Sequence, residues 1–152
     1  MAEQEIPDGL SADYVNEPVE AALAELNAHP DWMHLAAFLA ALGEGFLVVD
    51  VTATNKKKAT HIRTVRSTRG ELVLPVFTSM AELRLAVPKN KRAEVKGAMM
   101  PARDALGLIT SDTFVAAQLN AGSAALVVQR SFVERILAGE PVDAATLESL
   151  AT

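Results

Sequence analysis

The hydroxyl pair Thr78-Ser79 is the part of this 152-residue sequence best placed to do chemistry. The pair follows the apolar run 72–77, which reads as a strand, and Ser79 stands three residues before Glu82, the spacing of a helix capping box. A helix that begins there offers free amides and the positive end of its dipole to an anion. Two interpretations stand side by side: the hydroxyls cap the helix, which the spacing favours, or they bind an anion.

Other residue types that carry catalysis are sparse. The three histidines are His29, His34 and His61, and the first two are five apart, so they do not share a helix face as zinc pairs do. The sequence has no cysteine, no nucleophile elbow, no Walker loop and no dinucleotide-binding glycine loop. We therefore expect no catalytic residue, no metal and no cofactor.

Asp50 is the one acid inside an apolar strand run, and we expect it to satisfy a backbone amide or pair with a base rather than to catalyse. An enzyme of unrecognised type would need a pocket that gathers Thr78, Ser79, Asp50 or Asn120 around a base. That alternative stays open, behind binding functions.

Charge is divided sharply along the chain. Residues 1–55 hold ten acids and no Lys or Arg, whereas residues 56–103 hold twelve of the fourteen basic residues and three acids. The candidate basic binding residues are Lys56, Lys57, Lys58, Arg63 and Arg66. Either the acidic N-terminal third of the same chain neutralises these residues, or the basic segment 56–96 binds an external anion. Among external anions nucleic acid is less favoured, because residues 56–76 contain no aromatic side chain on which bases could stack.

Composition indicates one globular domain. Half of the residues are apolar, mean hydropathy is +0.19 and only 5% are aromatic, so aliphatic side chains and alanine must fill the core. The acidic N-terminus does not resemble a signal peptide, and no apolar run approaches the ~20 residues of a membrane span. We expect a cytoplasmic protein with no membrane contact, in which a flexible acidic lead, 1–15, precedes a single domain, 16–152.

The first half of the domain predicts two helices and a hairpin. Asn16 and Asp31 are suitable caps for amphipathic helices that stop near His29 and Gly43. The apolar run 45–51 predicts a central strand covered on both faces. Residues 60–67 predict a polar strand paired with the strand 72–77, in which Pro75 requires an edge position or a bulge.

The second half predicts alternating helices and strands. Helices are expected at 80–86, from Pro101 onward, at 132–138 behind a second capping box from Ser131 to Glu134, and at 143–150. Strands are expected at 114–119 and 125–129, with a turn at Asn120 to Gly122. The whole is an α+β (mixed α/β) fold, with two N-terminal helices and a single sheet of about five strands on which the helices pack.

Three segments carry a family resemblance. The strand-to-helix sequence Leu74-Pro-Val-Phe-Thr-Ser79, the helix start at 100–106 and the strand and turn at 115–122 resemble the N-terminal domain of the SseB family, the enhanced serine sensitivity proteins. The resemblance implies an α/β fold of bacterial type, reaching from about Val19 to Gly139, and it implies no catalytic residues.

We expect a non-enzymatic binding or regulatory domain that meets a protein partner. The candidate binding residues are Phe77, Thr78, Ser79, Asn120 and Gly122, together with the basic residues named above. Anion or nucleic-acid binding through the basic segment is the alternative, and steep weakening by salt would identify it.

Overall fold

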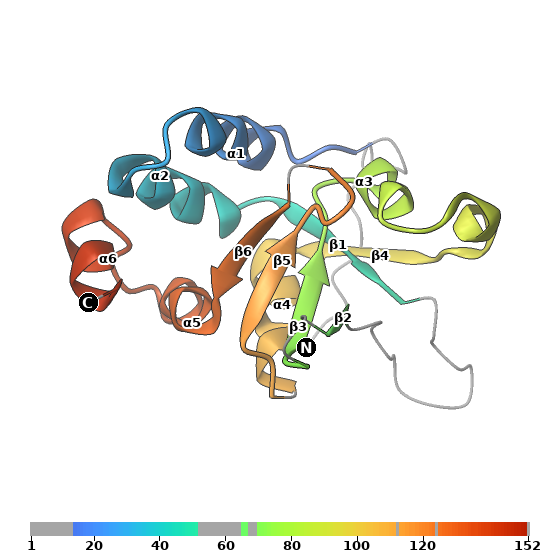
Figure 1. Ribbon diagram of the computed structural model, residues 1–152. Coiled ribbons are helices and arrows are strands. Elements are labelled where there is room, and N and C mark those ends of the chain that lie inside the picture. The colour runs from blue at the N-terminus through green and yellow to red at the C-terminus, as the bar shows by residue number, and fades with distance from the viewer. Residues whose placement is uncertain (1–13, 52–64, 67–69, 112, 124, 152) are drawn as a thin grey trace.

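The computed structural model describes residues 14–51, 65–66, 70–111, 113–123 and 125–151, and Figure 1 shows their arrangement. Its elements are α1 (Glu17–Ala28), α2 (Trp32–Leu42), β1 (Phe46–Asp50), β2 (Val65–Arg66), β3 (Leu72–Val76), α3 (Met80–Leu85), η1 (Lys89–Glu94), β4 (Gly97–Pro101), α4 (Ala102–Gly107), η2 (Leu108–Ser111), β5 (Ala116–Leu119), β6 (Leu126–Gln129), α5 (Arg130–Ala138) and α6 (Ala144–Ala151).

The two N-terminal helices begin where their caps predict. The Asn16 side chain accepts a hydrogen bond from the Val19 amide at 3.3 Å, and Asp31 accepts one from the His34 amide at 2.8 Å. The Asn16 side-chain amide also donates to the Phe46 carbonyl at 2.9 Å, so the same residue ties α1 to the start of β1. Both predicted helices are confirmed.

The predicted α+β fold is confirmed, but its strands form two sheets instead of one. A four-stranded sheet has the order β2-β3-β5-β6, with β3 and β5 parallel and the outer pairs antiparallel. The predicted central strand, β1, pairs instead with β4 in a two-stranded sheet. One bridge joins the sheets: the amides of Val48 and Phe77 donate to each other's carbonyls at 2.8 and 2.9 Å.

Pro75 lies where β3 has a described partner on one side only. The described residues of β2 pair with Leu72 and Val73, and β5 continues along β3 past Pro75. The Asn120 amide donates to the Val76 carbonyl, so by alternation the Pro75 nitrogen faces away from β5 and no ladder bond to β5 is lost. The hairpin pairing of β2 and β3 is confirmed. The residues before Val65 that would face Pro75 lie outside the described residues, so the edge position or bulge stays a prediction.

The larger hydrophobic core lies between the four-stranded sheet, β1 and the helices, and it includes Leu47 and Val49 of β1. Fully buried members include Phe38, Leu39, Leu74, Leu106 and Leu147. In Figure 1, α1 and α2 lie at one end of the sheet, and α4 lies behind it. A smaller cluster of Val48, Phe77 and Leu83 fills the space where the bridge joins the two sheets. Most buried core residues are therefore aliphatic, as the low aromatic content predicts, and four phenylalanines complete the core: Phe38, Phe77, Phe114 and Phe132.

Two sequence-based predictions were wrong in detail. Ser131 is not a cap, because Gln129 is the last extended residue and α5 begins at Arg130, which places Ser131 inside the first turn. The strand β4 was not predicted, since Gly97-Ala-Met-Met-Pro101 has no β-branched residue to suggest one. Within the described ranges, no helix is both long and apolar enough to cross a bilayer.

Candidate functional site

The junction between β3 and α3 has the predicted form. The backbone is extended through Val76, and Ser79 caps α3: its hydroxyl accepts a hydrogen bond from the Glu82 amide at 3.1 Å. The reciprocal half of the capping box is absent, because the Glu82 carboxylate instead accepts from the Ser123 hydroxyl at 2.7 Å. Ser79 thus acts as a helix cap, and Glu82 connects α3 to the turn between β5 and β6.

Thr78 is the centre of a buried polar network. Its side chain has no exposed surface, and its hydroxyl donates to a carboxylate oxygen of Glu20 at 2.6 Å. The same hydroxyl accepts from the side-chain amide of Asn120 at 3.1 Å, and the Asn120 side-chain oxygen accepts from the Thr78 amide at 3.0 Å. Helix α1, the β3–α3 junction and the turn after β5 therefore meet at one threonine.

Asn120 holds this network from an unusual backbone position. It has a positive φ of 50°, a left-handed conformation that asparagine tolerates better than most residues. Two residues on, Gly122 packs against α3, and a Cβ there would lie 2.5 Å from the backbone carbon of Leu85. The turn is therefore fixed by its own amide and by direct contact with α3.

A groove with two carboxylates opens beside this network. We call it the acidic groove: it has a volume of about 390 Å³ and is lined by Glu20, Leu23, Ala24, Asn27, Glu82, Asn120 and Ser123. Each carboxylate accepts one hydrogen bond from a hydroxyl, Glu20 from Thr78 and Glu82 from Ser123. Among the lining residues that the structure describes there is no Lys or Arg.

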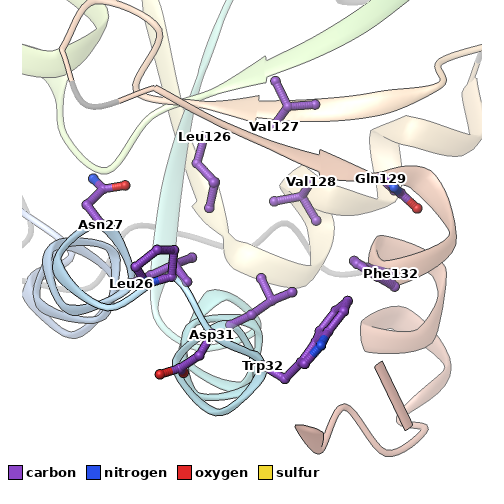
Figure 2. A pocket seen from close by; sticks show the side chains of 11 residues that line it. Leu26, Asn27, Asp31, Trp32, Leu126, Val127, Val128, Gln129 and Phe132 are labelled. Atoms are coloured by element: carbon purple, nitrogen blue, oxygen red, sulfur yellow. The ribbon is translucent and has the colours of Figure 1, made fainter. Parts of the chain in front are cut away.

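A second groove, of about 520 Å³, lies between β6 and the turn that joins α1 to α2. We call it the apolar groove; Leu26, Pro30, Trp32, Leu35, Leu126, Val128 and Phe132 supply most of its wall. Figure 2 shows Leu126 and Val128 pointing into it and Val127 pointing away, the alternation of a β-strand. Asn27 lines both grooves, so the two adjoin.

The strand β6 forms one edge of its sheet. Its partner β5 occupies one side, and no other strand of the described residues pairs with it. The Arg130 amide donates to the Val115 carbonyl, so by alternation the Val127 N–H and C=O point to the open side. The Val127 side chain is 56% exposed, and the sequence of β6, Leu-Val-Val-Gln, has no charge or proline to discourage pairing.

His29 and His34 come together in a way that their spacing does not predict. Their rings stack with centroids 5.1 Å apart, because the chain reverses direction between them at the α1–α2 turn. His34 Nδ1 lies 2.7 Å from Asp31 Oδ1. The His34 amide, and then its imidazole, hold the pKa of Asp31 below its ordinary value of 3.8. This is a solvent-facing cap, and no group of three metal-binding side chains occurs among the described residues.

The structure separates the predicted site residues into two groups. Phe77, Thr78, Ser79 and Asn120 are buried, so they reach a partner only if the junction opens, while Gly122 is exposed. Lys56, Lys57, Lys58 and Arg63 lie outside the described residues, and Arg66 is described through its pairing with Leu72. Their contact with α1 is therefore not described. Asp50 is buried and has an interaction partner.

Sequence reasoning missed the residues that surround the junction. No sequence pattern singles out Glu20, Trp32, Val127 or Phe132. The only signal was the lack of any charge or proline in 125–129, which marks an unprotected edge once the strand is known to lie at one.

Comparison with known proteins shows a family but no individual relative. No curated protein and no solved structure matched the chain. A family model, described as the SseB protein N-terminal domain, matched residues 19–135. The match covers most of the chain, including the β3–α3 junction and the Asn120 turn. The chain therefore belongs to the SseB family, through that family's N-terminal domain.

Proposed function

We propose that this chain is a non-enzymatic binding or regulatory domain of the bacterial cytoplasm, and that it meets a partner protein along the open edge of β6. The proposal rests on one observation: the open edge of β6 lies directly beside the apolar groove. Strand addition to a sheet edge gives affinity through the backbone and specificity through pockets for alternate side chains. Here the outward N–H and C=O of Val127 can supply the backbone hydrogen bonds, and the apolar groove can supply the pocket.

The state of the junction hydroxyls supports binding over catalysis. The Thr78 hydroxyl donates to Glu20 and accepts from Asn120, and the Ser79 hydroxyl caps α3. A nucleophile needs a base that takes its proton, and the base must be within hydrogen-bond reach. The Glu20 carboxylate accepts the Thr78 hydrogen bond, but Thr78 is fully buried and Ser79 is 3% exposed, so neither hydroxyl is open to a substrate. These residues hold the scaffold that positions the two grooves.

The test removes one outward backbone donor. In Val127→Pro the strand loses an N–H that faces the open edge and keeps its ladder with β5, while Val127→Thr retains both the N–H and β-branching. Tagged wild-type protein and both variants are cross-linked to their partners in native cells, and recovered proteins are compared by mass spectrometry. We expect specific partners to be lost in Val127→Pro and kept in Val127→Thr.

Two controls make this result decisive. Circular dichroism and urea unfolding must show that both variants fold as the wild type does. If every partner that binds wild-type protein also binds folded Val127→Pro, the edge of β6 is not the binding surface and the proposal fails.

A further inference from the structure

We infer that the occupant of these grooves is an extended segment of a partner protein that has alternating apolar residues and, at one end, a Lys or Arg that enters the acidic groove. This inference rests on the proposed function, because it assumes strand addition at β6. It adds that the partner segment has alternating apolar residues and that its basic residue lies at one end.

The apolar part follows from the pleat. Leu126 and Val128 point into the apolar groove, opposite Trp32 and Phe132, and Val127 points away (Figure 2). A strand added beside β6 shares this alternation, so its residues next to Leu126 and Val128 also point into the groove. The wall there is largely apolar, so these residues must be apolar, while the residue between them meets exposed Val127 and solvent.

The basic part follows from where the groove leads. Asn27 borders both grooves, and Ser123, which lines the acidic groove, lies three residues before Leu126 at the start of β6. A segment that runs past Leu126 therefore reaches Glu20 and Glu82. Each carboxylate accepts one hydroxyl hydrogen bond through one of its two oxygens, and an ionised carboxylate has further acceptor capacity for a cation.

The charge of the surrounding helices is consistent with this choice. From Tyr14 to Gly45 the chain has five acids and no Lys or Arg. An acidic segment would be repelled by this wall, whereas a basic one is attracted during its approach. Charge complementarity therefore selects a basic segment over a neutral or acidic one.

The experiment selects peptides from a display library of random sequences of about twelve residues, long enough at about 3.3 Å per residue to cover β6 and pass its end. Selection on the wild-type protein is followed by binding measurements on Val127→Pro, Glu20→Gln, Glu82→Gln and, as a matched control, Glu148→Gln on α6. Both groove glutamines keep an oxygen that can accept from Thr78 or Ser123, and they remove the charge by replacing the other oxygen with an NH2 group.

We expect the selected peptides to alternate apolar residues and to carry Lys or Arg at one end. Val127→Pro should abolish their binding, each groove substitution should weaken it by about two- to five-fold, in the range of partly exposed ion pairs, and Glu148→Gln should have no effect. The loss should shrink as salt is raised.

The outcomes separate the two proposals. Peptides that bind folded Val127→Pro as well as wild type would overturn both. Peptides that require the β6 edge but show no basic preference, and bind the two groove variants unchanged, would overturn this inference and leave the proposed function standing.

Discussion

A single hydroxyl joins three distant parts of this chain. Thr78 bonds to Glu20, 58 residues away, and to Asn120, 42 residues away, and none of the three is paired by a local pattern. Buried polar groups destabilise a protein when they lose their partners, since desolvation is no longer compensated. The network therefore specifies how α1, α3 and the β5–β6 turn sit together, as well as adding stability.

Thr78→Val tests this network. Valine has nearly the same shape, but it leaves the Asn120 amide without its acceptor and Glu20 without its donor, so we expect a loss of about 1–3 kcal/mol in the free energy of unfolding, measured with urea. The matched control is Ser123→Ala, which removes an exposed hydroxyl bonded to Glu82 and should cost less than about 0.5 kcal/mol. Equal losses would show that burial of the network is unimportant.

At the scale of elements, caps and close contacts decide where the helices and turns lie. Asp31 caps α2 and Asp143 caps α6 by accepting hydrogen bonds from backbone amides. Gly139 ends α5 in a left-handed conformation with φ 71°. These devices are local, so the sequence predicts them well. The contact of Gly122 with α3 is not local, and the sequence predicts only its turn.

The cap of α6 gives a pH prediction. The amide of Thr146 holds the pKa of Asp143 below its ordinary value of 3.8, so the unfolded chain binds this proton more readily than the folded one. The cap therefore stabilises fully above the unfolded-state pKa, and its contribution is lost as the pH falls through the folded-state pKa. Asp143→Ala should lower the urea midpoint at neutral pH and leave it unchanged below both pKa values.

Asp143→Asn serves as the control for that measurement. Asparagine keeps a capping oxygen without a titrating charge, so its midpoint at neutral pH should lie closer to that of the wild type than the alanine variant's does. An alanine effect of the same size at every pH would mean that the carboxylate charge plays no part.

Gly122→Ala tests the contact between the turn and α3. The added Cβ would lie within 2.7 Å of the backbone of Leu85 and Ala86, which cannot yield as a side-chain tip can, so we expect a loss of at least about 1–3 kcal/mol. At Gly107, by contrast, a Cβ meets nothing within 4 Å, and Gly107→Ala at the end of α4 should be neutral or stabilising by up to about 1 kcal/mol. Thermal unfolding of the pair would compare them, and a tolerated Gly122→Ala would contradict the described turn.

At the scale of the whole molecule, one backbone bridge among the described residues links the two sheets. Val48 and Phe77 join them through paired backbone hydrogen bonds, and their side chains share the smaller core with Leu83. The β1–β4 ladder has no other described backbone bridge to the four-stranded sheet. Phe77, which is 2% exposed, therefore shares this attachment with Leu47 and Val49 of β1, which are buried in the larger core.

Phe77→Ala should weaken that attachment first. Removing the Phe77 ring should lower the free energy of unfolding by about 3–5 kcal/mol. Native-state hydrogen exchange should then show the amides of β1 and β4 exchanging faster than those of β5. Met33→Ala, on a side chain that is 74% exposed, is the control and should change stability by less than about 0.5 kcal/mol. Uniform acceleration across both sheets would show that the two ladders open as one unit.

Local chemistry explains which parts of the structure could be predicted. Helix starts at Asn16, Asp31 and Ser79 follow from side chains that cap within three residues. The division into two sheets could not be predicted, because it depends on which strand Val48 meets across the fold. The apolar groove beside β6 could not be predicted either, because it brings together Trp32 and Phe132, which are a hundred residues apart in sequence. Short-range periodicity contains no information about such pairs.

The threonine network also sets an order on biosynthesis. Helix α1 leaves the ribosome early, yet Thr78 and Asn120 are translated much later. Until Asn120 has emerged, a nascent chain can place Thr78 beside Glu20 but cannot complete the interior around it. Docking of the first helices onto the sheet must therefore be reversible during most of translation, and ribosome-bound chains that stop before residue 120 should stay open to proteases along α1.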